Sequence, residues 1–214
     1  MQNQMTILWD WNGTLLDDIQ ICIDAINIML RDRQKAEISR ETYRNIFTFP
    51  VRDYYARAGF NFNDEPFEKP ALEFIEHYDS LISTAALFED ARATLKALNQ
   101  RGFQQMILSA MEQDFLSETV AMHSIDHFFE KISGIDNHFA AGKVDNARKL
   151  IAGMNGRAEK IIMIGDTIHD HEVGIEVGIE VLLVDRGHQS GERLRQTGRT
   201  VVNNFSEVVE YINQ

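Results

Sequence analysis

The sequence has few of the residues that mark secreted, membrane or nucleic-acid-binding proteins. Its 214 residues include one cysteine and three prolines, so no internal disulfide can form and a reducing compartment is expected. No apolar run approaches the roughly 18 residues of a membrane span, and the first residues carry no basic signal region. Lys and Arg number 21 against 33 Asp and Glu, for a formal net charge of -12. We therefore expect a cytoplasmic protein that binds neither nucleic acid nor an anionic membrane.

Four short apolar runs, each ending at polar or glycine residues, predict a parallel β-sheet. They cover residues 5–9, 105–108, 160–164 and 181–184 and end at Asp10, Ser109, Gly165-Asp166 and Asp185. Such runs fit strands that are covered on both faces. Helical patterns over 90–100, 112–122 and 144–152 separate them, and Gly102 and Gly153 are expected to cap the first and the last. The alternation predicts an α/β fold with ligands at the carboxyl ends of the strands.

Residues from about 17 to 86 interrupt this alternation. Apolar residues recur at helical spacing from Leu15 to Met29, and further helices are predicted over 39–47, 51–58 and 71–82. Pro66 and Pro70 lie around the start of the last helix, where proline is tolerated. We therefore expect an α/β core of residues 1–16 and 87–214, with residues 17–86 forming an all-α insertion.

Polar motifs follow the predicted strands. The segment Asp10-Trp11-Asn12-Gly13-Thr14-Leu15-Leu16-Asp17-Asp18 follows the first strand directly, and Gly165-Asp166-Thr167-Ile168-His169-Asp170 follows a later one. Together with Ser109 and Lys143, these segments resemble the four-motif signature of the haloacid dehalogenase-like (HAD) hydrolases, over Asp10 to about Gly178. The insertion is similar to the C1 cap of the phosphoglycolate phosphatase-like branch. The resemblance implies a HAD-like Rossmannoid parallel sheet core with an inserted all-α cap.

The chemistry of these residue types fits phosphoryl transfer. A carboxylate at a strand end can attack phosphorus, which divides hydrolysis into two easier steps through an acyl phosphate. Phosphoryl transfer needs charge neutralisation above all, so a divalent cation and a lysine are expected at the same point. Oxygen ligands such as Asp10 and Asp166 suit Mg²⁺.

The resemblance also implies a role for each residue. Asp10 would be the nucleophile and a metal ligand, and the main-chain carbonyl of Asn12 a second ligand. Asp166 would complete the protein ligands, with Asp170 directed toward the metal or its waters. Ser109 and Lys143 would hold the phosphoryl oxygens of a small phosphorylated metabolite. Thr14, Ala110 and Thr48 complete the residues expected at the substrate. The resemblance thus implies a Mg²⁺-dependent phosphoric monoester hydrolase; the sequence does not indicate its oligomeric state.

Asn12 departs from the family pattern, in which the residue two after the nucleophile is usually an acid/base aspartate. An amide cannot shuttle a proton at neutral pH, and losing general acid–base catalysis typically costs about 10²–10⁴ in rate. A leaving group of low pKa, or another group acting as the base, would restore hydrolysis. The alternative is a catalytically impaired HAD domain that binds metal and a phosphorylated ligand for regulation or recognition.

Two related groups of enzymes with other activities also lack the second aspartate. L-2-haloacid dehalogenases have no acidic metal motif, so Asp166 and Asp170 argue against that activity. Phosphonoacetaldehyde hydrolases carry a tryptophan after the nucleophile, as Trp11 does, but they need a Schiff-base lysine from the cap. Lys35 and Lys69 are the lysines of the insertion, and neither lies near the expected spacing.

Several candidates have a plain structural explanation as well. Lys143 fits a surface lysine before a helix, and Asp170 fits a first-turn carboxylate that favours the helix dipole. His169 and His171 flank Asp170 without sharing a helix face, so at least one is expected to have no role in the site. The segment 47–51, which contains Thr48, resembles the specificity loop of C1 caps. Arg44 and Arg52 flank it and would meet an anionic substrate or remain solvated.

Overall fold

A computed structural model describes residues 5–135, 142–154 and 160–213. Its main sheet has six parallel strands in the order β5-β4-β1-β6-β7-β8. The strands are β1 Met5–Trp9, β4 Gln104–Glu112, β5 Lys131–Ile135, β6 Lys160–Gly165, β7 Glu180–Val184 and β8 Val201–Val202. The α/β fold with a parallel sheet is thereby confirmed, and β1, which carries Asp10 at its end, lies in the interior of the sheet.

Successive strand residues point to opposite faces of the sheet, and both faces are buried. In β1, Ile7 and Trp9 join the hydrophobic cluster on one face, whereas Leu8 joins the cluster on the other. The same division holds in β6, where Ile162 and Met163 belong to opposite clusters. This two-sided burial explains why the strands read as continuous apolar runs.

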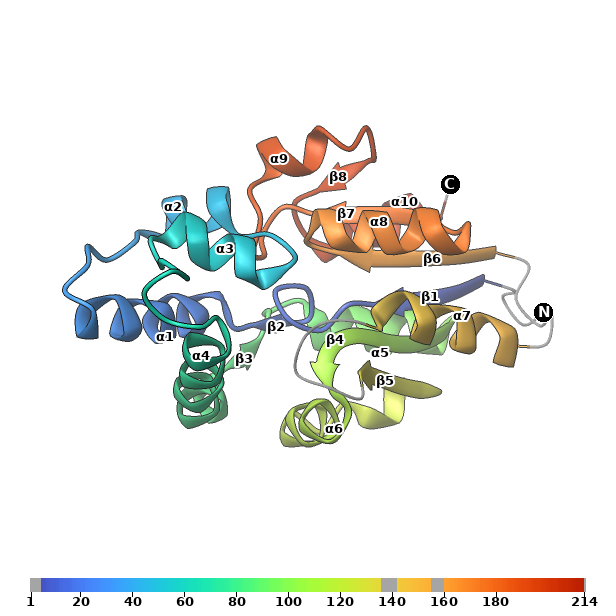
Figure 1. Ribbon diagram of the computed structural model, residues 1–214. Helices are drawn as coiled ribbons and strands as arrows, with labels where there is room; N and C mark the ends of the chain where they lie inside the picture. Colours follow the sequence, from blue (N-terminus) through green and yellow to red (C-terminus); the bar gives the residue numbers. More distant parts are fainter. Residues whose placement is uncertain (1–4, 136–141, 155–159, 214) are drawn as a thin grey trace.

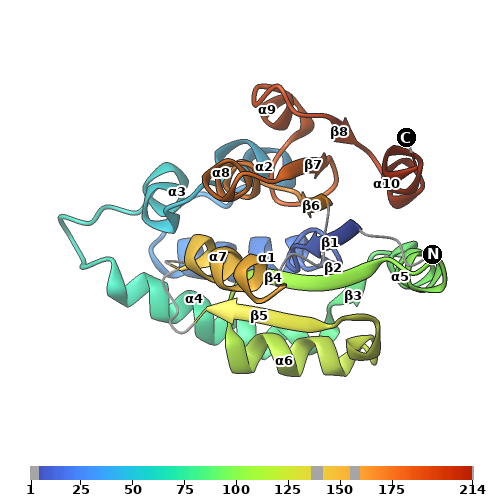
Figure 2. The same ribbon diagram turned by 90° about the vertical axis from the view of Figure 1, so that its right-hand side faces the viewer.

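Helices cover both faces of the sheet (Figure 2). One face carries α5 Ala91–Gln100 and α10 Phe205–Ile212, together with α6 Gln113–Met122; the other carries α7 Lys143–Gly153 and α8 Ile168–Val177. The short helices are α9 Gly191–Arg195 and the 3-10 turns η1 Ile82–Thr84 and η2 Asp126–Phe128. In the part of the chain that the structure describes, no helix is long and apolar enough to cross a membrane.

Four helices between β2 and β3 lie beyond the carboxyl ends of the strands (Figure 1). They are α1 Ile19–Asp32, α2 Arg40–Ile46, α3 Val51–Ala58 and α4 Glu68–Leu81. The strands β2 Leu16–Asp17 and β3 Ala86–Leu87 pair antiparallel, so the helical segment leaves and re-enters the core through one two-stranded ribbon. We call the segment 19–84 the cap helices. The ribbon lies at the expected junctions, and the division into a core of 1–16 and 87–214 with a cap of 17–86 stays a prediction.

The structure corrects several predicted element boundaries. Strand β4 continues past Leu108 to Glu112 through a register shift, so Ser109 lies within it rather than at its end. Gly153 is the last residue of α7 and Met154 the cap, whereas Gly102 follows α5 with φ 80° as expected. Helix α4 begins at Glu68, three residues earlier than predicted, because Pro70 occupies its first turn without disturbing it.

Candidate functional site

Lys143 joins two carboxylates at the carboxyl edge of the sheet. Its Nζ donates to Asp10 Oδ1 at 2.6 Å and to Asp170 Oδ1 at 2.7 Å. All three side chains are at most 8% exposed, so the lysine is not a solvated surface residue. Asp10 follows β1 directly, Lys143 begins α7, and Asp170 lies in the first turn of α8. Three segments far apart in the sequence therefore meet at one point.

The charges of this cluster are strongly coupled. Burial raises the pKa of Asp10 well above its usual value, although Lys143 lowers it. Burial alone would lower the pKa of Lys143, but the Asp10 and Asp170 carboxylates raise it. Burial would raise the pKa of Asp170, but Lys143 and the Thr167 hydrogen bonds lower it. The arrangement is a buried cation held between two carboxylates, one of which also caps α8 through Thr167.

Asp166 approaches the same cluster from the end of β6. Its Oδ1 accepts from the Thr14 hydroxyl at 2.9 Å, and its Oδ2 accepts from the His188 main-chain N–H at 2.5 Å. Burial raises the pKa of this carboxyl to about 6, although His188 acts in the opposite direction. Oxygen atoms of Asp10, Asp166 and Asp170 lie within 4.8 Å of one another. This set of hard oxygen donors can hold a divalent cation.

Asn12 is fixed by a buried hydrogen-bond network. Its Nδ2 donates to Asp18 Oδ2 at 2.8 Å and to the Tyr78 hydroxyl at 2.9 Å. Tyr78 in turn donates to Asp18 Oδ2 at 2.7 Å, and the Gly13 N–H donates to Asp18 Oδ1 at 2.9 Å. The carboxylate of Asp18, the residue before α1, thus accepts from the amide of Asn12. The acidic group of this network therefore lies at position 18 rather than at position 12, where the family pattern has its acid/base aspartate.

His188 completes this network from the loop after β7. Its Nε2 lies 3.3 Å from Asp18 Oδ1, and its Nδ1 lies 2.9 Å from the Tyr43 hydroxyl. Burial alone would lower the pKa of His188, but the Asp18 carboxylate raises it to about 9. Burial would raise the pKa of Asp18, yet His188 and the hydrogen bonds lower it. The two side chains form a buried ion pair beside Asn12.

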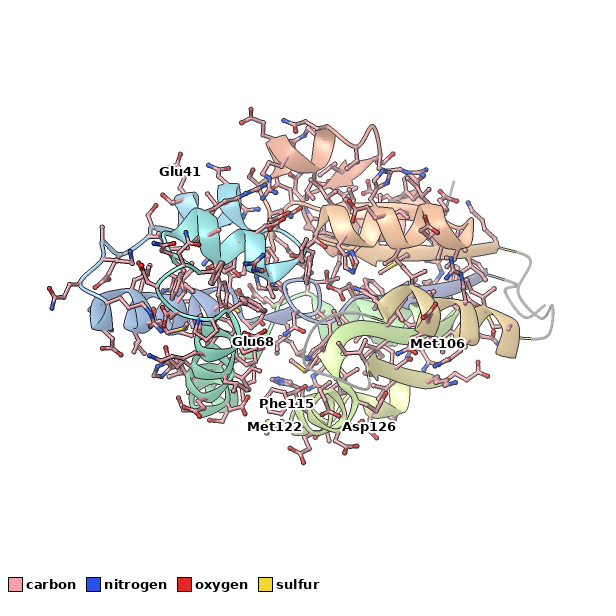
Figure 3. The ribbon with its side chains drawn as sticks, viewed as in Figure 1. Glu41, Glu68, Met106, Phe115, Met122 and Asp126 are labelled. Carbon is pink, nitrogen blue, oxygen red and sulfur yellow. The ribbon has the colours of Figure 1, made fainter. Side chains whose placement is uncertain are left out.

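A cavity of about 320 Å³ opens beside the Asp10 carboxylate. Asp10, Asn12, Ser109, Ala110 and Lys143 line one end. Ser109 is buried, and its Oγ accepts from the Met111 N–H at 3.0 Å. The cap helices with the loops between them, α6, the end of β4 and His188 form the rest of the wall, and Figure 3 labels Phe115 on α6. The cavity therefore lies between the sheet edge and the cap helices.

Some candidates lie elsewhere. Thr14 supports Asp166 and does not line the cavity. Thr48 does not line it either; its hydroxyl donates to the Phe49 carbonyl at 3.3 Å, and the neighbouring rings of Phe47 and Phe49 face the cavity instead. Neither threonine therefore lies on the cavity wall, and their contact with a substrate stays a prediction.

The two cap arginines do not reach the cavity. Arg44 binds Asp185 Oδ1 at 2.7 Å and the carbonyls of Gly187 and Gln189, and Arg52 lies over the ring of Phe62. Arg44 is thus engaged by the core, whereas Arg52 is exposed to solvent.

The two histidines beside Asp170 serve other contacts. His169 lies against the Phe49 ring, with 4.7 Å between centroids, and His171 Nδ1 accepts from Arg199 Nε at 3.1 Å. The cap lysines also stay outside the cavity, since Lys69 is 62% exposed and pairs with Glu65. No described cap lysine is therefore placed for a Schiff base beside Asp10.

Sequence comparison places these motifs in a known family. A sequence model described as "Haloacid dehalogenase-like hydrolase" matches residues 7–184. The chain belongs to the haloacid dehalogenase-like hydrolase family. A phosphoglycolate phosphatase of Colwellia psychrerythraea is 27% identical, over 92% of this chain and 92% of that protein. A pyrophosphatase, PpaX, of Anoxybacillus flavithermus is 24% identical over 82% and 81%. The expected family and its phosphoglycolate phosphatase-like branch are thereby confirmed.

Solved structures of HAD hydrolases share the fold. A haloacid dehalogenase-like family protein of Streptococcus pneumoniae superposes with a TM-score of 0.84 at 22% identity, covering 98% of this chain and 99% of that one. The similarity spans core and cap helices together. It supports the architecture described above and says nothing of the substrate.

Sequence patterns did not identify His188, Tyr43 and Tyr78 as site residues of this HAD hydrolase. One signal was available for His188, which follows the fourth apolar run and so belongs to the carboxyl edge of the sheet. Tyr43 and Tyr78 lie on separate cap helices, α2 and α4. Periodicity assigns such residues to the buried face of a helix but does not show which strand they meet.

Proposed function

We propose that this HAD hydrolase is a Mg²⁺-dependent phosphatase that hydrolyses small phosphorylated metabolites through an aspartyl phosphate on Asp10. The observation that carries the proposal is the contact of Lys143 Nζ with both Asp10 and Asp170, beside Asp166. A nucleophilic carboxylate, a buried cation and two further carboxylates meet at the mouth of a cavity that can hold a small molecule.

The donor set fits Mg²⁺, which prefers one or two carboxylates together with water and phosphate oxygens. Asp10, Asp166 and the carbonyl of Asn12 would hold the ion, with Asp170 toward its waters. When bound, Mg²⁺ neutralises charge on the transferring phosphoryl group. Thr14 and the His188 N–H fix both oxygens of Asp166, so that carboxylate is oriented before any ligand arrives.

The chain's own residues supply attack and charge stabilisation. Asp10 attacks phosphorus with one carboxylate oxygen, and the substrate P–O bond breaks to release the leaving group. Lys143 and the Ser109 hydroxyl would hold the phosphoryl oxygens at the point where charge develops. The cap helices restrict access of water to the cavity during this step. Water then attacks the aspartyl phosphate and releases inorganic phosphate.

Asn12 supports a second candidate, a HAD domain that binds metal and a phosphorylated ligand but turns over poorly. Both hydrogens of its Nδ2 are engaged by Asp18 and Tyr78, so the amide is part of a fixed network and offers no proton to a leaving group. Nothing in that network weakens binding by Asp10, Lys143 or Asp166.

Phosphate release by wild type, with Asp10→Asn as the blank, decides between the candidates. The panel contains phosphorylated metabolites and an activated aryl phosphate, each with Mg²⁺. Turnover above the blank supports the phosphatase. Phosphate release equal to the blank, together with a Mg²⁺-dependent thermal shift by inorganic phosphate, supports the binding domain. A cytoplasmic location is part of the same proposal, and fractionation of cells that express the tagged chain tests it.

A further inference from the structure

The cavity beside Asp10 has an aromatic wall. Rings of Phe49, Tyr55, Phe67, Phe74, Tyr78 and Phe115 line it. They come from the loop before α3, from α3, from the N-cap and body of α4, and from α6. All but Phe49 contact one another in a chain: Phe74 stacks on Tyr78 with centroids 5.9 Å apart, and Tyr78 meets Phe115 edge-on at 6.3 Å. A wall of mutually packed rings is preformed and favours a flat, apolar ligand group.

The described residues place no basic side chain in the part of the cavity away from Asp10. Among the described residues that line the cavity, Lys143 and His188 are the only basic ones. Lys143 contacts Asp10, and His188 pairs with Asp18, so both lie at the end that receives phosphate.

Nearby cap arginines are engaged elsewhere. Arg33 is paired with Glu65 and Glu73, and Arg44 with Asp185. Acidic Asp79 and Glu112 line the cavity instead. A leaving group with a carboxylate or a second phosphate would therefore meet no basic side chain among the described residues of this part of the cavity, and an unpaired charge in an apolar space is costly. This distinguishes the cavity from one built for phosphoglycolate or pyrophosphate.

Asn12 imposes a second requirement on the leaving group. Because the amide at position 12 donates no proton to it, the leaving oxygen departs as an anion, and the stability of that anion controls the rate. A phenol such as tyrosine has a pKa of about 10, whereas an aliphatic hydroxyl resembles water, whose pKa is about 15.7. An aryl oxide therefore leaves without proton transfer far more readily than an alkoxide does.

Resting on the proposed function, we propose that the substrate of this site is a low-molecular-weight aryl phosphate monoester whose uncharged ring fills the aromatic cavity. An Asp10 oxygen bonds to phosphorus as the aryl P–O bond breaks, and the aryl oxide leaves with the electron pair and takes a proton from water. A water oxygen then bonds to phosphorus as the bond to Asp10 breaks; the carboxylate is regenerated and the proton of water passes to solvent.

The second of these steps also lacks an acid/base residue at position 12, whatever the leaving group is. The aspartyl phosphate is therefore expected to accumulate when an aryl substrate makes the first step fast. Stopped-flow measurement with 4-nitrophenyl phosphate should show a burst of phenol release close to one equivalent per site, followed by slower turnover.

Matched substrates separate the two requirements. Phenyl phosphate and cyclohexyl phosphate have similar size and apolarity but leaving groups of different acidity; 2-phosphoglycolate and pyrophosphate add charge. With Mg²⁺, kcat/KM for phenyl phosphate is expected to exceed that of each other compound by about 10²-fold or more. A phosphoglycolate or pyrophosphate value equal to or above that of phenyl phosphate would overturn the inference, as would equal values for the phenyl and cyclohexyl esters.

Other outcomes are equally decisive. A short peptide that carries phosphotyrosine is expected to be hydrolysed at least about 10-fold less well than phenyl phosphate, because the cavity holds about 320 Å³. The reverse order would contradict a small-molecule substrate. If no compound is hydrolysed above the Asp10→Asn blank, the proposed function itself fails; hydrolysis of the charged compounds alone removes only the aryl specificity.

A charge placed in the wall tests the cavity directly. Phe74→Arg adds a counterion, so the ratio of kcat/KM for phenyl phosphate to that for phosphoglycolate is expected to fall about 10-fold or more. A change that merely disturbed packing would lower both values together. Ile75→Arg, which enters the same cavity from the next position of α4, repeats the test if the first variant does not fold. An unchanged ratio in a folded variant would overturn the inference.

Discussion

At the scale of single residues, the site depends on which carboxylates share a counterion. Lys143 lies within 2.7 Å of Asp10 and Asp170 and is 2% exposed. Asp18 is shared among Asn12, Gly13, Tyr78 and His188. Removing one member of either set leaves a buried charge with too few partners, and such losses are larger than those of surface ion pairs.

Lys143→Ala removes the cation between two buried carboxylates. We expect kcat to fall by about 10² or more and the free energy of unfolding to fall by about 3 kcal/mol without metal, measured by urea titration. Added Mg²⁺ should restore part of that stability. Lys149→Ala is the control, because Lys149 lies on the same helix and is exposed. An equally small effect of both variants would contradict the buried cluster.

Asn12→Asp places a second carboxylate where Nδ2 now meets Asp18 Oδ2 at 2.8 Å. The two groups repel or must share a proton, so the single variant should lose about 1–3 kcal/mol of unfolding free energy at pH 7. Asn12→Asp with Asp18→Asn reverses the polarity of that contact. The double variant removes the repulsion between positions 12 and 18 but also the carboxylate that pairs with His188, so it should regain only part of the lost stability. It should hydrolyse an alkyl phosphate faster than the single variant does.

The control for Asn12→Asp is Asn203→Asp. In wild type the exposed Asn203 Nδ2 donates to Glu207 at 3.1 Å. The same substitution faces a carboxylate there but is screened by water, so its effect should stay within about 0.5 kcal/mol. If Asn12→Asp is as stable as wild type and as active as the double variant, Asp18 does not constrain position 12 as described.

At the scale of elements, the sequence predicted those that bury continuous apolar runs. The runs at 5–9, 160–164 and 181–184 gave β1, β6 and β7 almost to the residue. The sequence did not reveal β5 or β8, because Lys131–Ile135 contains Gly134 and Val201–Val202 is too short to show a pattern. Pairing with β4 stabilises β5, and pairing with β7 stabilises β8. Both strands thus depend on tertiary contacts rather than on a local sequence pattern.

Two helical glycines show how close packing positions the site. A Cβ on Gly174 of α8 would lie 2.1 Å from Val181 Cγ2 in β7, whereas a Cβ on Gly153 of α7 would meet nothing within 4 Å. Gly174→Ala should therefore destabilise the protein by about 1–3 kcal/mol, and Gly153→Ala should stabilise it by roughly 0.5–1 kcal/mol. Thermal unfolding of both variants measures the difference; equal shifts would show that α8 does not pack closely against β7.

At the scale of the whole molecule, the cap helices are attached to the core at a second place besides the ribbon. Arg44 of α2 binds Asp185 and two carbonyls of the loop after β7, and Arg193 of α9 donates to the Phe47 carbonyl at 2.6 Å. The same loop supplies His188. The sequence could not show this attachment, because Arg44 and Asp185 are far apart and neither belongs to a motif.

Arg44→Ala should loosen the cap helices without unfolding the core. It removes three charge-assisted contacts, each typically about 1.5–3 kcal/mol, so hydrogen exchange in α2 is expected to rise while exchange in β1 and β6 stays the same. KM should rise more than kcat falls. Arg31→Ala removes an exposed pair with Glu37 inside the cap and is the matched control. Faster exchange in both variants, or in neither, would argue against this attachment.

The central claim is that Asp10 carries the phosphoryl group between the two steps. The direct measurement is mass spectrometry of enzyme that is acid-quenched during turnover of phenyl phosphate with Mg²⁺. We predict one phosphoryl group on the peptide that contains Asp10 in wild type, and none in Asp10→Asn. Phosphate release by wild type with no phosphoryl group on that peptide would contradict the account.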